Sequence, residues 1–169
     1  MRTNRNGFSL LEIIIYIAVF AFVSVVAVET ILLVTSSLGR IRVVRTLNTA
    51  SSSAMERMTR TIRDAKIINA GSSTFNTSPG VLSLTGSETP AITYRFSVSG
   101  GGLVLDAGGV ETALTPPGVA VTNLVFRSIA NGTVSKAIKI ELTIAASNGK
   151  ATSSENVYNT VILRNSYAP

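Results

Sequence analysis

The chain has 169 residues, a net charge of +6 at pH 7, and no histidine, cysteine or tryptophan. Its length accommodates one domain together with an anchor. Without histidine and cysteine, the chain can form no Ser-His-Asp triad, cysteine nucleophile, zinc finger, iron–sulfur cluster or disulfide. The composition therefore excludes these classes of catalytic and metal site. Together with the absence of catalytic and nucleotide-binding motifs described below, it leads us to predict that the protein is not an enzyme and uses no cofactor.

The apolar residues are concentrated near the N-terminus. Residues 8–34 contain 22 apolar residues among 27. As a helix this segment measures about 40 Å, whereas the hydrocarbon core of a membrane is about 30 Å thick. The segment is too long for the apolar region of a secretory signal peptide, and no small-residue cleavage site closes it. It therefore predicts a transmembrane helix.

A short basic leader, MRTNRNG, precedes this helix. The leader ends at Gly7, and Phe8-Ser9-Leu10-Leu11-Glu12 follows directly. This arrangement resembles the prepilin signal of type IV pilins and type II secretion pseudopilins. The resemblance implies that a prepilin peptidase cuts between Gly7 and Phe8 at the cytoplasmic face of the membrane and then N-methylates Phe8. It also implies a cytoplasmic N-terminus. The basic residues do not decide the orientation themselves, because they flank both ends of the helix.

Glu12 is the polar residue that bears most on function. A carboxylate inside a membrane helix costs about 2.5–3.5 kcal/mol at the bilayer centre. One interpretation is that Glu12 lies at the interface and extends into the headgroups. The resemblance implies another role, in which Glu12 pairs with the N-terminal amine of Phe8 on a neighbouring subunit. Because buried ion pairs can fix register, Phe8 and Glu12 are the predicted subunit-docking residues. A second carboxylate, Glu29, is expected to face water near the outer end of the helix.

Helical periodicity continues beyond the apolar segment. From Ile41 to Ile68, apolar residues recur at steps of three or four, and Asn69-Ala70-Gly71 is a plausible end. We predict one helix over about residues 9–69, roughly 90 Å long if straight. Its first half is transmembrane and its second half is amphipathic.

Positive charge is concentrated in the same part of the chain. Residues 1–66 carry a net charge of +5 and residues 67–169 a net charge of +1. The nearly neutral C-terminal part does not suggest a nucleic-acid-binding domain. The basic run of the second helical half is expected to be a solvated face, with a DNA- or lipid-binding face as the alternative. This run consists of Arg57, Arg60, Arg63 and Lys66.

The C-terminal part is predicted to be β-rich. Residues 92–98 and 138–144 alternate strictly between apolar and polar, which is typical of half-buried strands. Glycines at 100–102 fit a hairpin turn. We predict an antiparallel sheet of about five or six strands with one face on the helix, hence an α+β fold. The further strand candidates are residues 81–85, 103–106, 119–129 and 157–164, and the further turns lie at 106–109 and Asn131-Gly132.

No motif of catalysis or nucleotide binding is present in this part. Asp106 and Glu111 lie in a glycine-rich stretch and are the best candidates for a calcium site. Two carboxylates are too few to predict one. The site prediction therefore has no catalytic, cofactor or metal residue.

The order of the predicted elements resembles that of the J-type minor pseudopilins and W-type minor pilins. The resemblance implies a pilin-like ladle with four segments: a cleaved leader over 1–7, the transmembrane and fibre-core half of the helix over 8–35, its amphipathic half over 36–70, and a β-rich head over 71–169. It implies a structural subunit that is assembled into an extracytoplasmic fibre or primes its tip. Unlike many major pilins, the chain has no cysteine for a C-terminal disulfide.

The partners that the resemblance implies are a prepilin peptidase, other major and minor pilin-like subunits, the inner-membrane assembly platform, and membrane lipid before assembly. We do not expect a nucleic-acid partner. The implied location is the inner membrane as a single-pass protein with its head outside, then the fibre. The alternatives are a major fibre subunit, a competence pilin that takes up DNA, and an uncleaved membrane-anchored binding domain.

Overall fold

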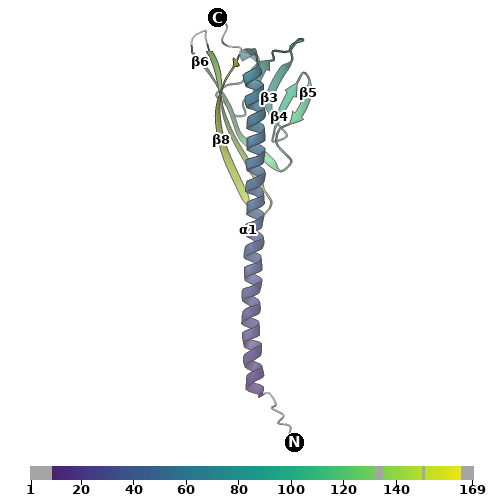
Figure 1. The fold of residues 1–169 in the computed structure, drawn as a ribbon, viewed down its shortest axis with the longest axis vertical. Helices are drawn as coiled ribbons and strands as arrows, with labels where there is room; N and C mark the ends of the chain where they lie inside the picture. The colour runs from purple at the N-terminus through teal and green to yellow at the C-terminus, as the bar shows by residue number, and fades with distance from the viewer. Residues whose placement is uncertain (1–8, 132–134, 150, 165–169) are drawn as a thin grey trace. The chain divides into compact units, whose positions relative to one another are not determined.

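The computed structural model describes residues 9–131, 135–149 and 151–164. These residues form one α-helix, one short 3-10 helix and eight strands in two antiparallel sheets (Figure 1). The chain divides into two compact units, Met1–Gly39 and Arg40–Pro169, and the division falls within the long helix. The α+β architecture is as predicted. In chain order the elements are α1 (Leu10–Asp64), β1 (Ile67–Ile68), η1 (Ala70–Ser72), β2 (Leu82–Thr85), β3 (Thr93–Ser99), β4 (Gly102–Ala107), β5 (Val110–Ala113), β6 (Val119–Asn131), β7 (Ser135–Ser147) and β8 (Thr152–Ile162).

The first unit consists of the apolar half of α1. This half is long and apolar enough to cross a membrane, and none of its most apolar stretch is buried within the protein. Large side chains are exposed all along it, among them Leu10 at 76% and Phe20 at 74%. Such a surface is stable only in lipid or against other apolar surfaces.

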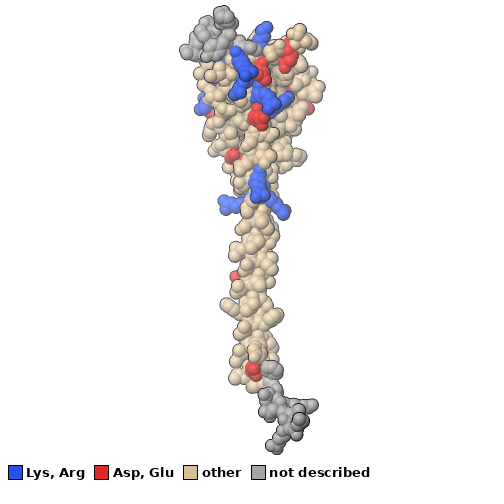
Figure 2. Space-filling view, viewed as in Figure 1, with Lys and Arg blue, Asp and Glu red and all other residues tan. Residues whose placement is uncertain are grey.

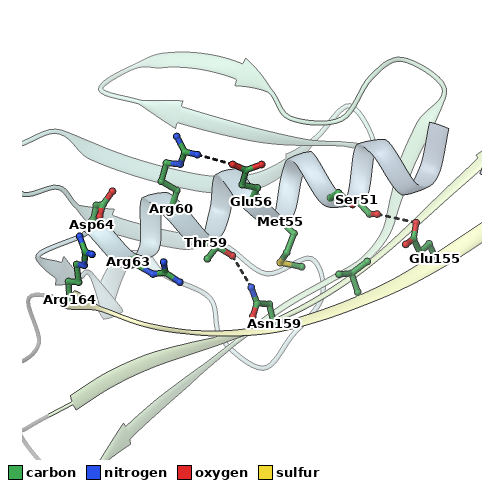
Figure 3. Close-up of a pocket in the computed structure, with 12 residues that line it drawn as sticks. Ser51, Met55, Glu56, Thr59, Arg60, Arg63, Asp64, Glu155, Asn159 and Arg164 are labelled. Atoms are coloured by element: carbon green, nitrogen blue, oxygen red, sulfur yellow. Dashed lines mark hydrogen bonds and ion pairs between the residues drawn. The ribbon is translucent and has the colours of Figure 1, made fainter. Parts of the chain in front are cut away.

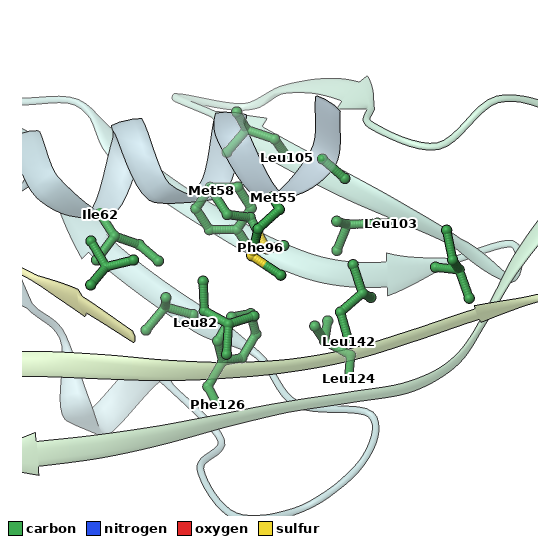
Figure 4. Packing of buried hydrophobic residues seen from close by; sticks show 14 of the residues in the cluster. Met55, Met58, Ile62, Leu82, Phe96, Leu103, Leu105, Leu124, Phe126 and Leu142 are labelled. Atoms are coloured by element: carbon green, nitrogen blue, oxygen red, sulfur yellow. The ribbon is translucent and has the colours of Figure 1, made fainter. Parts of the chain in front are cut away.

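In the second unit, the remaining part of α1 packs on both sheets. Its buried residues recur at steps of three or four, which confirms the predicted amphipathic face. Figure 4 shows Met58 and Ile62 pointing from the helix toward Leu82, Phe96 and Phe126 of the sheets, and all five are fully buried. The buried residues of α1 are Val43, Leu47, Ala50, Ser51, Ala54, Met55, Met58 and Ile62.

The strands form two sheets rather than the single sheet that was predicted. The first has the order β1-β2-β3-β4-β5 and the second the order β6-β7-β8, with antiparallel neighbours throughout. The predicted glycine turn joins β3 to β4, where Gly100 and Gly101 have φ values of 58° and 80° that favour glycine. Strands β1 and β5 were not predicted. Gly132, from the third predicted turn, lies outside the described residues.

The helix ends at Asp64, earlier than the predicted residue 69. The chain then becomes extended, and Ile67 and Ile68 pair with Thr85 and Leu84 of β2. The backbone N–H of Lys66 donates to the Thr85 carbonyl over 2.8 Å. Isoleucine is β-branched and suits a strand better than a helix end. The spacing of Ile68 fits a helical face equally well, which is why the sequence pattern predicted a longer helix.

The loop before β2 ties the two sheets together. The backbone N–H of Gly80 donates to the Leu124 carbonyl of β6 over 2.7 Å, and that of Asn76 donates to the Phe126 carbonyl over 2.9 Å. A Cβ atom at position 80 would lie 3.0 Å from the Leu124 carbonyl oxygen. Glycine therefore permits this close approach of two backbones.

A small cluster of charges lies on the second sheet. Glu141 of β7 accepts hydrogen bonds from Arg127 of β6 and forms an ion pair with Lys139, with N–O distances of 2.9 Å to each. The two cations, Arg127 first, lower the pKa of Glu141 from its ordinary 4.5 to about 2. The ionised carboxylate therefore stabilises the fold above about pH 4.5, and this contribution is lost as the pH falls toward 2.

We accordingly expect Glu141→Gln to lower the melting temperature of the protein at pH 7, and to lower it much less at pH 2.5. Thermal unfolding of both proteins at the two pH values measures this difference. Glu111→Gln is the control, because Glu111 lies on the exposed edge strand β5 and has no ion pair among the described residues. An equal loss of melting temperature at both pH values for Glu141→Gln would contradict the electrostatic origin.

Candidate processing and docking site

The predicted site lies at the start of the chain, and the structure describes part of it. Gly7 and Phe8 lie outside the described residues, so the structure leaves the cleavage position as a prediction. The described chain begins at Ser9, whose carbonyl accepts the backbone N–H groups of Glu12 and Ile13 over 3.0 and 3.2 Å. Helix α1 therefore starts directly after the predicted cleavage position.

The Glu12 carboxylate is in the first turn of α1. A negative charge is favourable there, because the first backbone N–H groups of a helix have no partner within it. The spacing of Ser9 and Glu12 is that of a capping box, in which the acidic side chain bonds back to the serine backbone. In the structure the carboxylate instead accepts a hydrogen bond from a residue further along the helix.

Its partner is Tyr16, one turn further on. The Tyr16 hydroxyl donates to Oε1 of Glu12 over 3.1 Å. Residues four apart are neighbours on a helix surface, and this spacing was the available sequence signal for the pair. Glu12 is half-buried, whereas the adjacent Leu11 and Ile13 are 67% and 48% exposed. The sequence analysis identified Glu12 and missed Tyr16.

The other polar groups of the apolar half differ from Glu12. The hydroxyls of Ser24, Thr30 and Thr35 each donate to a carbonyl of their own helix over 2.6–2.8 Å. These hydroxyls therefore need no hydrogen-bond partner from another molecule. Glu29 makes no hydrogen bond or ion pair with any residue that the structure describes, and it borders a shallow hollow with Leu32, Leu33 and Ser36.

The basic run of α1 is mixed in charge. Arg60 pairs with Glu56 over 2.8 Å, and both side chains are more than 60% exposed. Figure 2 shows acidic side chains among the basic ones on this face. Arg57 and Asp64 line a smaller hollow together with Glu88. A surface of alternating sign lacks the continuous positive potential that a nucleic-acid backbone requires.

A groove of about 590 Å³ runs between α1 and β8 (Figure 3). Two hydrogen bonds cross it. The Ser51 hydroxyl donates to Oε2 of Glu155 over 3.0 Å, and Nδ2 of Asn159 donates to the Thr59 hydroxyl over 2.9 Å. Four of the polar side chains that line the groove therefore hold the last strand against the helix.

Of the two carboxylates considered for calcium, Asp106 has a structural role. Asp106 and Glu111 face each other across the β4–β5 hairpin. Oδ1 of Asp106 accepts the backbone N–H of Gly109 over 2.7 Å, which closes the turn. Within residues 9–131, 135–149 and 151–164, no group of three or more acidic side chains is placed to hold a metal ion.

Comparison with known proteins gives one match. A family model described as the prokaryotic N-terminal methylation motif matches residues 2–28. This range includes Gly7, Phe8, Glu12 and Tyr16, and it ends within the apolar half of α1. No curated protein and no solved structure matches the chain.

Proposed function

We propose that this chain, a type IV pilin- or pseudopilin-like precursor by its N-terminal methylation motif, is a minor structural subunit of a type IV pilus or a type II secretion-like machine. A prepilin peptidase cuts it between Gly7 and Phe8 and methylates Phe8. The mature subunit is stored in the inner membrane, with its N-terminus cytoplasmic and its head outside. It then enters an extracytoplasmic fibre or primes the tip of that fibre. Its work is assembly and not catalysis.

The observation that carries this proposal is the position of the motif. It matches residues 2–28, and the helix begins at Leu10 with an exposed apolar surface, none of whose most apolar stretch is buried by the described residues. A bilayer covers such a surface before assembly, and the equivalent surfaces of neighbouring subunits cover it in a fibre. Both environments require the same apolar exterior, so one segment serves for storage and for the fibre core.

The β-rich head supports a role in partner choice. Its core is built from α1 and both sheets. Among the described residues, every buried side-chain nitrogen and oxygen atom has a hydrogen-bond partner. The predicted order of the helix and strands resembles that of the J-type minor pseudopilins and W-type minor pilins, and this resemblance favours a minor over a major subunit. A DNA-uptake pilin is the weaker candidate because the basic run of α1 is interleaved with acidic residues.

The direct test is the N-terminus of the protein in membranes from cells with and without a prepilin peptidase. We expect mass spectrometry to find methylated Phe8 at the N-terminus only when the peptidase is present. Gly7→Val should retain the leader in both strains. Gly71→Val is the matched control, because a Cβ atom at that position of η1 meets no atom within 4 Å, and it should be processed normally. Retention of residues 1–7 in both strains would refute the proposal in favour of an uncleaved membrane anchor.

A further inference from the structure

We infer that Tyr16 is a positioning residue for subunit docking, which holds the Glu12 carboxylate in place for the cationic amine of a neighbouring chain. This inference rests on the proposed function. The Tyr16 hydroxyl donates to one carboxylate oxygen of Glu12, Oε1, over 3.1 Å. The other oxygen, Oε2, accepts no hydrogen bond from the part of the chain that the structure describes.

The hydrogen bond from Tyr16 suits a carboxylate that must hold one conformation before its partner arrives. A glutamate side chain has several rotamers, and fixing it at the moment of docking costs conformational entropy. A hydrogen bond within the same helix already fixes the side chain, so this entropy is lost before docking and not during it. A tyrosine hydroxyl donates a hydrogen bond without cancelling the negative charge, so the charge remains available to an incoming amine. One oxygen is thus held by the chain itself and the other is left for the neighbour.

The surroundings favour this role over simple membrane anchoring. Tyrosine is common at membrane interfaces, where its ring is in lipid and its hydroxyl meets water. Here the hydroxyl is aimed at Glu12, which is half-buried beside it. The hydroxyls of Ser24, Thr30 and Thr35 bond to backbone carbonyls, so among these polar side chains Tyr16 alone is directed at a charged one.

The test compares the fraction of processed protein that reaches the assembled fibre for Tyr16→Phe, Glu12→Asp and the double variant, all in the full-length chain. Tyr16→Phe keeps the ring and removes the donor. We expect it to be cleaved and methylated normally and to reduce the assembled fraction by about three- to tenfold, which is the typical net effect of losing one intramolecular hydrogen bond. Ser24→Ala, which removes a hydroxyl that bonds to its own helix, should assemble normally.

The double variant separates positioning from packing. Aspartate keeps the charge but is one methylene shorter, so it does not reach Tyr16. If Tyr16 acts through Glu12, adding Tyr16→Phe to Glu12→Asp has no further effect. Normal assembly of Tyr16→Phe, or the same fold reduction in both backgrounds, would overturn the inference. The proposed docking role of Glu12 is tested separately by Glu12→Ala. Normal assembly of Glu12→Ala would refute that docking role, whatever the result for Tyr16→Phe.

Discussion

Glu12→Ala should reduce the assembled fraction of this protein about a hundredfold or more, with cleavage after Gly7 unchanged. Removing one partner of a buried ion pair leaves the other charge uncompensated and costs about 3–5 kcal/mol, and each ~1.4 kcal/mol is a factor of ten in an equilibrium. The uncompensated charge in the variant is the amine of Phe8 on the neighbouring subunit. The measurement is the ratio of fibre-bound to membrane-bound protein in an otherwise wild-type strain.

Glu29→Ala is the matched control for this experiment. Glu29 is the other carboxylate of the apolar half of α1, and it has the same side chain without a tyrosine one turn away. Because Glu29 is expected to face water near the outer end of the membrane helix, it should be replaceable with little effect on assembly. Equal loss of assembly in both variants would mean that the fibre requires negative charge in the helix in general and not a docking contact at Glu12.

Phe96→Ala should destabilise the head by about 3–5 kcal/mol, since it removes a buried aromatic ring and leaves a cavity. Phe96 is fully buried in β3, and Figure 4 shows it beneath α1 beside Met55 and Met58. The ring lies where the helix meets the first sheet, so surrounding side chains cannot refill the space without moving the helix. The corresponding drop in melting temperature is about 10 °C or more.

Thermal unfolding of the full-length protein in detergent, followed by the β-sheet circular dichroism signal, measures this change. Val110→Ala is the control, because Val110 is 67% exposed on the edge strand β5; its effect should stay within about 0.5 kcal/mol. A loss of stability below about 1 kcal/mol for Phe96→Ala would show that the helix and the first sheet are not packed as described. A cavity of that size in a close-packed core destabilises a protein by more than this.

The helix and the longer strands could be predicted because their signals are local. Apolar residues from Val43 to Ile62 follow the helical period, and residues 138–144 alternate with the strand period. The short strand β1 could not be predicted, because two isoleucines fit either period and only pairing with β2 makes them a strand. The division into two sheets has the same cause, since strand pairing depends on distant residues and not on the local pattern.

The candidate site was predicted in part for a similar reason. Glu12 is conspicuous because a charge in an apolar run carries a known cost. Tyr16 is not, because aromatic residues are ordinary in membrane helices, and only the direction of its hydroxyl distinguishes it. Side-chain direction, unlike charge, could not be read from the sequence.

The two hydrogen bonds between α1 and β8 have a mechanical consequence. Ser51 and Thr59 are eight residues apart on the helix, about 12 Å at 1.5 Å per residue; their partners Glu155 and Asn159 are four residues apart on the strand, about 13 Å at 3.3 Å per residue. Helix and strand therefore run alongside in step, and a pull along the helix axis shears both bonds and the apolar contacts between them at once. Contacts that share a load in this way resist tension better than contacts that break one after another. Under the proposed function, this property suits a subunit that is pulled from the membrane by its helix.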